Sequence, residues 1–383
     1  MMEKKLGFFI PNLNEALKLV GNSKAFKVKK ELVDGEEFTI ICYRFVDYED
    51  FLDDYRKLEF RGIAYHNETG KAFLSCHKFF NYGEVPETDY LFNNNDNEVL
   101  ATEKVDGSLI VPIYINNKLL LKTRQSFKSE HCNTAYEFIT DNLNYYKFIK
   151  DCFSNNLIPL FELLSPKHRI VIPYSETILK LIQIRDLSTG NYLPYERLQE
   201  LAQEYQVDYV KADKLSVEEL ERLCVTEEGI EGYVAIVDYT NPFGFKKFKT
   251  SWYLHRHKIM TDLHLHEAVQ LILEDKVDDL LSILPKDFPL YKETMRALNL
   301  INNLRYVIEK KVGKLKKLNL DRKEFVRKYK NDLFFPVIVK AIYEDRDVDL
   351  LLKSFILKKC NKLKQAKRFL IEVENYLRED TNA

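Results

Sequence analysis

The sequence predicts an α+β fold in which a strand-rich domain, residues 1–254, is followed by an all-α domain, residues 255–383. Up to about residue 253, short runs of β-branched and aromatic residues alternate with turn residues, as is typical of strands. From His255 onward the apolar residues follow helical spacing, with almost no glycine. The 383 residues, of which 45% are hydrophobic, suffice for two domains with separate cores.

Composition excludes several classes of protein. The formal net charge is −1, with 58 basic and 59 acidic residues, so attraction to nucleic acid must come from local clusters of charge. The six cysteines include no Cys-x-x-Cys pair, which disfavours a zinc ribbon and a disulfide scaffold. No stretch is apolar enough for a signal peptide or a membrane span. We therefore expect a soluble cytoplasmic protein that has no membrane partner.

The N-terminal part of the strand-rich domain combines framework elements with two cation-bearing segments. We predict a helix over 13–20 and strands over 38–45, 57–65 and 74–82. The second strand carries Arg61, and the third joins Lys78 to Phe79 and Phe80. Such residues suit a phosphate and the face of a base. They also suit an edge strand with core phenylalanines and a solvated lysine, and that alternative stays open here.

Lys104 lies in an apolar setting. The runs 99–102 and 109–115 are predicted strands, so Asp106-Gly107-Ser108 is predicted to be the tight turn between them, with Lys104 at a strand end facing a pocket. An amine has an ordinary pKa of roughly 10.4 and attacks only as the free base, so a nucleophilic lysine needs partial burial or neighbouring cations. A plain hairpin turn is the structural alternative.

The middle of the domain adds two cations and a lone carboxylate. A strand over 119–126 carries Lys122 and Arg124 with a spacing that places both on one face. A helix follows over 132–149, and a strand over 160–164 carries Glu162 in an otherwise apolar run. Because a buried carboxylate is rare without partners, we expect Glu162 to face a polar site. A strand over 179–184 and helices over 195–205 and from Ser216 complete this part.

The last strands of the domain are predicted as an antiparallel pair, 231–237 and 245–253, joined through Asn241-Pro242-Phe243-Gly244. Glu231 leads the first strand. Lys247 and Lys249 share one face of the second, which a solvated outer face would also explain.

The second domain is predicted to be helical and basic. Helices are expected over 263–275, 277–284, 291–312, 321–329, 337–343, 348–357 and 362–377. Between Arg305 and Arg368 there are 20 Lys or Arg residues and 8 Asp or Glu residues. This excess suits contacts with a phosphate backbone, or it is a solvated helix surface.

The polar residues of the first domain suit a nucleoside triphosphate. Cations can hold its phosphates, carboxylates can hold magnesium and ribose, and an aromatic face can hold the base. For covalent transfer, an amine must lie in line with the α-phosphate.

The chain resembles the covalent nucleotidyltransferase superfamily of DNA ligases, RNA ligases and capping enzymes, and within it the phage-type tRNA-repair RNA ligases. The motifs that carry the resemblance follow in order along the chain: Glu59-Phe60-Arg61-Gly62-Ile63, Lys78-Phe79-Phe80-Asn81, Lys104-Val105-Asp106-Gly107-Ser108, Phe161-Glu162, Arg169-Ile170-Val171, Ile230-Glu231-Gly232-Tyr233-Val234-Ala235 and Lys247-Phe248-Lys249-Thr250-Ser251-Trp252-Tyr253.

The resemblance implies an antiparallel-sheet adenylyltransferase domain, a helical RNA-recognition domain and an ATP-dependent RNA ligase. Lys104 would attack the α-phosphate of ATP, release pyrophosphate and carry AMP as a phosphoramidate. The AMP would pass to a 5′-phosphate of RNA, and a 3′-hydroxyl would then displace it. Implied partners are Mg²⁺ or Mn²⁺ and RNA with such ends, expected to be a tRNA broken in its anticodon loop, and we expect a monomer.

The resemblance also implies a role for each matching residue. Catalytic roles fall to Lys104, Lys247, Lys249 and Glu231, with Lys247 and Lys249 lying on the α-phosphate and lowering the pKa of Lys104. Nucleotide-binding roles fall to Arg61, Lys78, Phe80, Glu103, Asp106, Gly107, Lys122, Arg124, Glu162 and Gly232. Metal-binding roles fall to Glu231, Glu162 and Asp278.

Two departures and three alternatives remain open. The family has Lys-Ser-Lys where this chain has Lys122-Thr123-Arg124, which keeps phosphate contact but puts any role that needs a lysine at 124 in doubt. The acidic pair Asp278-Asp279 is only a short match. The alternatives are a capping guanylyltransferase, a DNA ligase and a non-catalytic RNA-binding protein. The first two normally carry a β-barrel where this chain is predicted to be helical.

Overall fold

The computed structural model describes residues 6–23, 25–43, 46, 48–93, 98–274, 277, 280, 281, 284, 286 and 288–381. The chain divides into two compact units, Met1–His255 and Arg256–Ala383. The sequence placed the boundary between residues 254 and 255. Among the described residues no helix combines the length and apolar character needed to cross a membrane.

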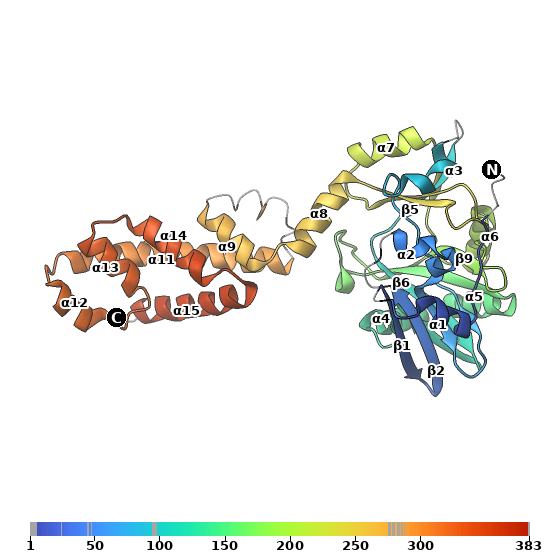
Figure 1. Cartoon of the computed structure of the whole chain (residues 1–383), viewed down its shortest axis with the longest axis horizontal. Coiled ribbons are helices and arrows are strands. Elements are labelled where there is room, and N and C mark those ends of the chain that lie inside the picture. Colours follow the sequence, from blue (N-terminus) through green and yellow to red (C-terminus); the bar gives the residue numbers. More distant parts are fainter. Residues whose placement is uncertain are drawn as a thin grey trace. The chain divides into compact units, whose positions relative to one another are not determined.

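Unit 1 is built on three four-stranded sheets whose strand ladders are all antiparallel, as predicted (Figure 1). Their orders are β1-β2-β3-β4, β10-β5-β11-β12 and β7-β6-β8-β9. The strands are β1 (Phe26–Val33), β2 (Glu36–Tyr43), β3 (Arg61–His66), β4 (Ala72–Phe73), β5 (Val99–Lys104), β6 (Ser108–Ile115), β7 (Lys118–Lys122), β8 (Leu157–Leu164), β9 (Ile178–Asp186), β10 (Ala212–Leu215), β11 (Gly232–Ile236) and β12 (Phe245–Lys249).

Short helices connect and cover these sheets. They are α1 (Leu13–Val20), α2 (Glu49–Leu52), α3 (Tyr90–Asn93), α4 (Glu130–Asp141), α5 (Leu143–Ser154), α6 (Tyr195–Tyr205) and α7 (Val217–Thr226), with single 3₁₀ turns η1 (Tyr55–Glu59), η2 (Pro86–Thr88) and η3 (Pro166–His168). The next helix, α8 (Ser251–Asp262), includes residues of both units. Their ends follow local chemistry: the Asn12 side chain accepts from Glu15 N–H at the start of α1, and Ser216 accepts from Glu219 N–H at the start of α7.

Five predicted elements were wrong in detail. The strand predicted over 57–65 begins only at Arg61, because residues 57–59 belong to the 3₁₀ turn η1. Within the described residues, segment 74–80 pairs with no strand; strand pairing in this part of the chain is limited to β4 and an isolated bridge at Asn81. β7 ends at Lys122, so Arg124 lies outside the strand and the two cations do not share a strand face. The helix predicted over 132–149 is interrupted at Asn142. Residues 251–253 start α8 instead of ending a strand.

The segment after Lys104 is a crossover between sheets. β5 pairs with β10 and β11, whereas β6 pairs with β7 and β8, so Asp106-Gly107-Ser108 does not close a hairpin as predicted. This crossover brings the end of one sheet beside β8 of the other, which is where the site is built.

Unit 2 is helical, as predicted. It contains α9 (Leu265–Leu273), α11 (Pro289–Lys316), α12 (Arg322–Tyr329), α13 (Phe335–Tyr343), α14 (Val348–Lys359) and α15 (Leu363–Thr381). One apolar core joins them, with Ala297, Ile301, Leu304 and Ile308 of α11 fully buried along one face at the spacing of a helix. The helix predicted over 277–284 lies largely outside the described residues.

Candidate active site

The backbone register brings Lys104, Glu231 and Lys249 together. β11 pairs with both β5 and β12, and Gly232 is the partner of Lys104 on one side and of Lys249 on the other. Glu231 immediately precedes that glycine and is 4% exposed. Its Oε2 lies 2.8 Å from Lys104 Nζ and its Oε1 lies 2.9 Å from Lys249 Nζ. One buried carboxylate therefore bridges two lysines from distant parts of the chain.

Two glycines allow the backbone to pass close to this cluster. Gly232 has φ +142°, and a Cβ built there would lie 1.9 Å from Phe248 O. At Gly107 a Cβ would lie 2.5 Å from Leu163 O and 2.9 Å from Glu162 Cγ. No side chain fits at either position.

Glu162 lies on β8 opposite Leu109 of β6, and thus approaches the cluster from the third sheet. Burial raises the pKa of the Glu162 carboxyl to about 7; Lys104 opposes this rise and Glu231 adds to it. Among the residues that the structure describes, this carboxylate makes no hydrogen bond or ion pair. Two acidic side chains therefore lie near each other, and one of them lacks a partner.

Lys247 is a half-buried cation at the site. Its Nζ donates to Phe79 O at 2.9 Å and lies 4.7 Å from the centroid of the Phe79 ring. Burial, and then the charges of Arg61 and Lys78, hold the pKa of Lys247 well below its ordinary value. A cluster of positive charge from four segments of the chain is therefore formed by Arg61, Lys78, Lys104, Lys247 and Lys249.

Phe80 is a core residue that lies against a site cation. It is 2% exposed and packs edge-to-face against Tyr48 and Phe51. Lys78 Nζ lies 4.4 Å from the centroid of the Phe80 ring and 3.9 Å from Glu84 Oε1. Contact of Phe80 with a nucleotide stays a prediction.

The Asp106 carboxylate is already saturated by protein donors. Oδ2 accepts from the N–H groups of Val171 and Ile172 at 2.7 and 2.8 Å, and Oδ1 accepts from the Tyr253 hydroxyl at 2.7 Å. The N–H of Asp106 donates to Tyr174 Oη at 3.1 Å. Asp106 thus fixes the loop after Lys104, and sequence reasoning missed these partners although Val171 lies in a motif.

The remaining predicted residues have mixed placements. Lys122 is fully buried, donates to Gly62 O at 2.6 Å, and has its pKa lowered by burial to about 8. The Arg124 guanidinium lies 5.1 Å from the centroid of the Tyr43 ring. Glu103 pairs with Lys180 at 3.2 Å. Nucleotide contact by these three residues stays a prediction. Asp278 lies outside the described residues.

The carboxylates at the site fit a divalent metal ion. Hard cations such as Mg²⁺ and Mn²⁺ prefer carboxylate oxygens. Glu162 has no protein partner among the described residues and a raised pKa next to Glu231, and a bound cation would relieve that repulsion. Glu162 and Glu231 are therefore the candidate ligands.

Comparison with known proteins gives consistent matches. The model of the RNA ligase family matches residues 59–253. A Thermovibrio ammonificans protein named "Putative RNA ligase" is 33% identical over 314 residues, 80% of each chain. RNA ligase 1 of bacteriophage TS2126 is 27% identical over 332 residues, 82% of this chain and 79% of the phage protein. The solved structure of an archaeal ATP-dependent RNA ligase aligns with TM-score 0.45 and 13% identity over 76% of each chain, a similarity too low to add to the sequence matches.

Proposed function

The chain belongs to the RNA ligase family, and we propose that it seals RNA ends with ATP through an adenylate carried on Lys104. The observation that carries this proposal is the bridge from Lys104 through Glu231 to Lys249. A plain hairpin lysine would not be held by a buried carboxylate that a second lysine shares.

The proposed chemistry has three steps. The Lys104 amine attacks the α-phosphorus of ATP, a P–N bond forms, and the bond from the α-phosphorus to the bridging oxygen breaks to release pyrophosphate. A 5′-phosphate oxygen of RNA then attacks the same phosphorus, and the P–N bond breaks. Finally a 3′-hydroxyl of RNA attacks the 5′-phosphorus and AMP leaves, which yields a phosphodiester.

The side chains around Lys104 suit the first step. Lys249 and Lys247 carry positive charge to the place where negative charge develops on the α-phosphate. Glu231 holds the Lys104 ammonium at 2.8 Å, which fixes its direction before the nucleotide arrives. Loss of that ion pair must precede attack, because the nucleophile is the free amine.

A divalent cation would be held by Glu231 and Glu162, and when bound it would neutralise phosphate charge. Binding of the cation would also weaken the ion pair between Glu231 and Lys104, because both would compete for the same carboxylate. Magnesium and manganese both fit oxygen donors, and we propose Mg²⁺ or Mn²⁺.

The proposal is tested by incubation with ATP labelled at the α-phosphate and denaturing electrophoresis. Lys104→Ala should lose all covalent label, and Lys249→Ala should lose most of it. Lys180→Ala is the matched control, because Lys180 is also paired with a carboxylate and its side chain is 20% exposed, against 22% for Lys104. Undiminished label on Lys104→Ala would reject the proposal, and labelling by GTP instead of ATP would favour a capping guanylyltransferase.

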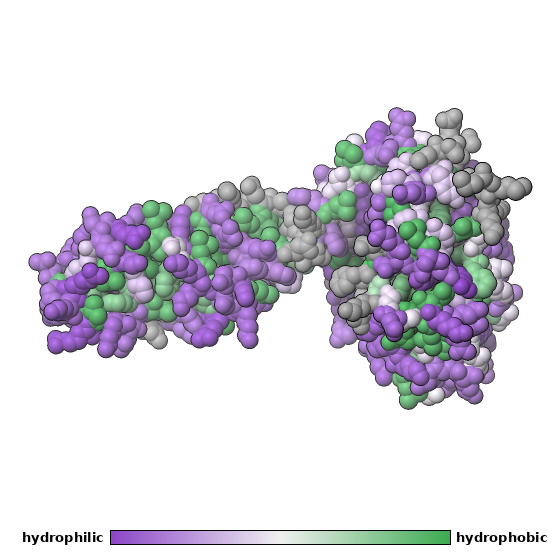
Figure 2. Space-filling view, viewed as in Figure 1, coloured by the Kyte–Doolittle hydropathy of each residue, from purple (hydrophilic) through white to green (hydrophobic). Residues whose placement is uncertain are grey.

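We also propose that unit 2 binds the RNA, and that the turn between α14 and α15 contributes to this. Residues 350–371 hold seven Lys or Arg residues and no Asp or Glu residue. A hollow of about 240 Å³ lies there, lined by Lys358, Lys359, Gln365, Arg368, Phe369 and Glu372. In the described part of the chain, Lys358, Lys359, Lys362 and Lys364 form no ion pair, so their charge is free for phosphates. Hydrophilic residues cover much of the visible face of this unit (Figure 2).

RNA binding tests this surface. The triple variant Lys358→Ala/Lys359→Ala/Lys362→Ala should weaken binding of a labelled RNA and lower its salt dependence by roughly 0.7 in log–log slope for each lost phosphate contact. Lys323→Ala/Lys328→Ala/Lys330→Ala is the matched control. It removes the same number of cations from another place in unit 2, on or next to α12. Tyr376, near the C-terminal end of α15, donates its hydroxyl to Asp332, three residues after α12, at 3.3 Å. The start of this 19-residue helix is therefore about 28 Å away. Equal losses in both variants would contradict a defined surface.

The physiological substrate is proposed to be a tRNA broken in its anticodon loop, acted on by a monomer. Sealing rates on nicked tRNA, unstructured RNA and nicked duplex RNA separate the possibilities. A clear preference for the tRNA is expected. Equal rates on unstructured RNA would contradict tRNA specificity without affecting the adenylylation chemistry.

A further inference from the structure

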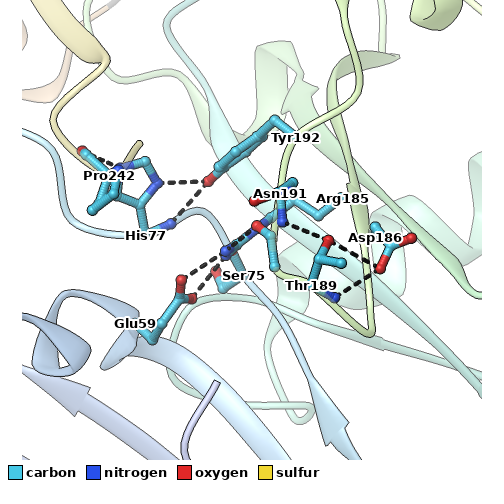
Figure 3. Close-up of polar contacts among 10 residues, drawn as sticks. Glu59, Ser75, His77, Arg185, Asp186, Thr189, Asn191, Tyr192 and Pro242 are labelled. Carbon is cyan, nitrogen blue, oxygen red and sulfur yellow. Dashed lines mark hydrogen bonds and ion pairs between the residues drawn. The ribbon is translucent and has the colours of Figure 1, made fainter. Parts of the chain in front are cut away.

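A buried ion pair lies next to segments of the chain that carry cations of the site. Arg185, at the end of β9, is fully buried and Glu59 is 3% exposed. The guanidinium donates to both oxygens of Glu59, at 2.8 and 2.6 Å (Figure 3). Its remaining N–H groups donate to Ser75 O at 2.6 Å and to Gly190 O at 2.9 and 2.6 Å. The pair is bidentate, and the guanidinium is saturated.

A histidine and a tyrosine continue this network. His77 Nε2 lies 2.8 Å from Pro242 O, which can only accept, so Nε2 carries the proton. Nδ1 then accepts from the Tyr192 hydroxyl at 2.8 Å, and that hydroxyl accepts from His77 N–H at 3.1 Å. Burial, and then the charge of Arg185, keep the pKa of His77 well below its ordinary value. The ring is therefore neutral, and every hydrogen bond has one direction.

Each end of the network is joined to a segment that carries a site cation. Glu59 ends η1, and Arg61 begins β3 two residues later. His77 precedes Lys78, whose N–H donates to Leu58 O at 2.7 Å. Pro242, held by His77, lies in the turn before β12, and Lys247 of β12 donates its N–H to Phe80 O at 3.0 Å. The network thus connects three segments that are far apart in the chain.

Stability alone explains such an arrangement poorly. Taking two charges out of water is costly, and well-packed apolar side chains of similar volume are often at least as stable. A bidentate ion pair and a fixed histidine tautomer do, however, allow only one relative position of the segments they join. Placement of charged groups to a fraction of an ångström is what phosphate binding and in-line attack require.

We propose that Glu59, Arg185, His77 and Tyr192 are positioning residues that hold Arg61, Lys78 and Lys247 on the phosphates of the nucleotide. This inference rests on the proposed function of the site. None of the four touches the nucleotide; they act through the backbone segments on which the three cations lie.

The N-terminal segment covers part of the network. The Phe8 ring lies 5.0 Å from the Arg185 guanidinium and 4.9 Å from the centroid of the His77 ring. Residues 6–9 line two hollows of about 550 and 310 Å³. Gly190 has φ +78°, and a Cβ there would lie 3.0 Å from Phe8 Cβ, so the turn that returns to Arg185 leaves no room for another side chain.

The test measures the Kd for ATP by calorimetry, covalent AMP labelling at saturating ATP, and thermal unfolding, all with the full chain. Glu59→Gln leaves Arg185 with an uncompensated charge. Tyr192→Phe removes one hydroxyl and keeps the ring. Glu36→Gln is the matched control, because Glu36 is 7% exposed and pairs at 3.0 Å with buried His66 at the other end of β3.

We expect Glu59→Gln and Tyr192→Phe to raise the Kd for ATP roughly tenfold or more, with saturated labelling reduced less. Glu36→Gln should lower the melting temperature comparably and leave the Kd within about twofold of the wild-type value. A Kd unchanged in both site variants, or raised equally in the control, overturns the positioning role. A wild-type protein that binds ATP but forms no lysyl adduct contradicts the proposed function, while the comparison of Kd values still decides this inference. A wild-type protein that does not bind ATP overturns both.

Discussion

Replacing Glu162 by glutamine should stabilise unit 1, and only at neutral to alkaline pH. The pKa of this carboxyl is raised from 4.5 to about 7 in the folded protein. A raised folded pKa gives a contribution to stability that is complete below pH 4.5 and is lost as pH rises through 7. At about 1.4 kcal/mol per pKa unit, the loss reaches about 3 kcal/mol. The side-chain amide of the variant carries no charge and avoids this loss.

The assay is urea unfolding followed by fluorescence of Trp252, the single tryptophan, which lies at the start of α8. Buffers from about pH 4.5 to about pH 8.5 should contain a chelator, so that no metal ion pairs with Glu162. The difference in unfolding free energy between Glu162→Gln and the wild type should become more favourable to the variant by up to about 3 kcal/mol across this range. Glu103→Gln removes a partly exposed carboxylate nearby and serves as the control. A difference independent of pH would refute the raised pKa of this half-buried, unpaired carboxylate.

Three further predictions follow from individual contacts. Gly232→Ala should abolish AMP labelling and lower the melting temperature, since its Cβ would meet Phe248 O, whereas Gly313→Ala, in open space on α11, should be neutral or stabilising in the same melts. Asp106→Ala should destabilise unit 1 by about 3 kcal/mol or more, because the N–H groups of Val171 and Ile172 and the Tyr253 hydroxyl lose their acceptor. Asp106→Asn should cost clearly less, and equal urea midpoints would contradict this. ATP binding at alkaline pH should be accompanied by uptake of a proton, because a bound phosphate raises the pKa of Lys247 back toward its ordinary value. Calorimetry in buffers of different ionisation enthalpy should detect this uptake. Proton uptake that persists in Lys247→Met would exclude Lys247 as the group that is protonated.

Local patterns identified much of the site. Lys104 stood between two apolar runs, Glu162 was a lone carboxylate in an apolar strand, and Lys247 and Lys249 alternated with Phe248. Each pattern depends only on neighbours in the sequence, and each of these side chains contributes to one charged cluster in the structure. The family motifs added their order along the chain.

The network around Arg185 could not be found in this way. Glu59 and Arg185 are 126 positions apart, and His77 and Tyr192 are 115 apart, so no local pattern links them. One signal was available: Arg185 ends a mostly apolar strand, the same observation that identified Glu162. The sequence also did not reveal that segment 74–80 is not a strand. Its aromatic residues are typical of a strand, but its backbone hydrogen bonds are made with η1 and β12.

The most direct test of the central claim is peptide mapping of the protein after reaction with ATP and a divalent cation. Mass spectrometry should find AMP on the peptide that contains Lys104, linked by an acid-labile phosphoramidate bond, and addition of RNA with a 5′-phosphate should remove it. An adduct on another lysine, or an adduct that RNA does not discharge, would contradict the assignment of Lys104 as the nucleophile.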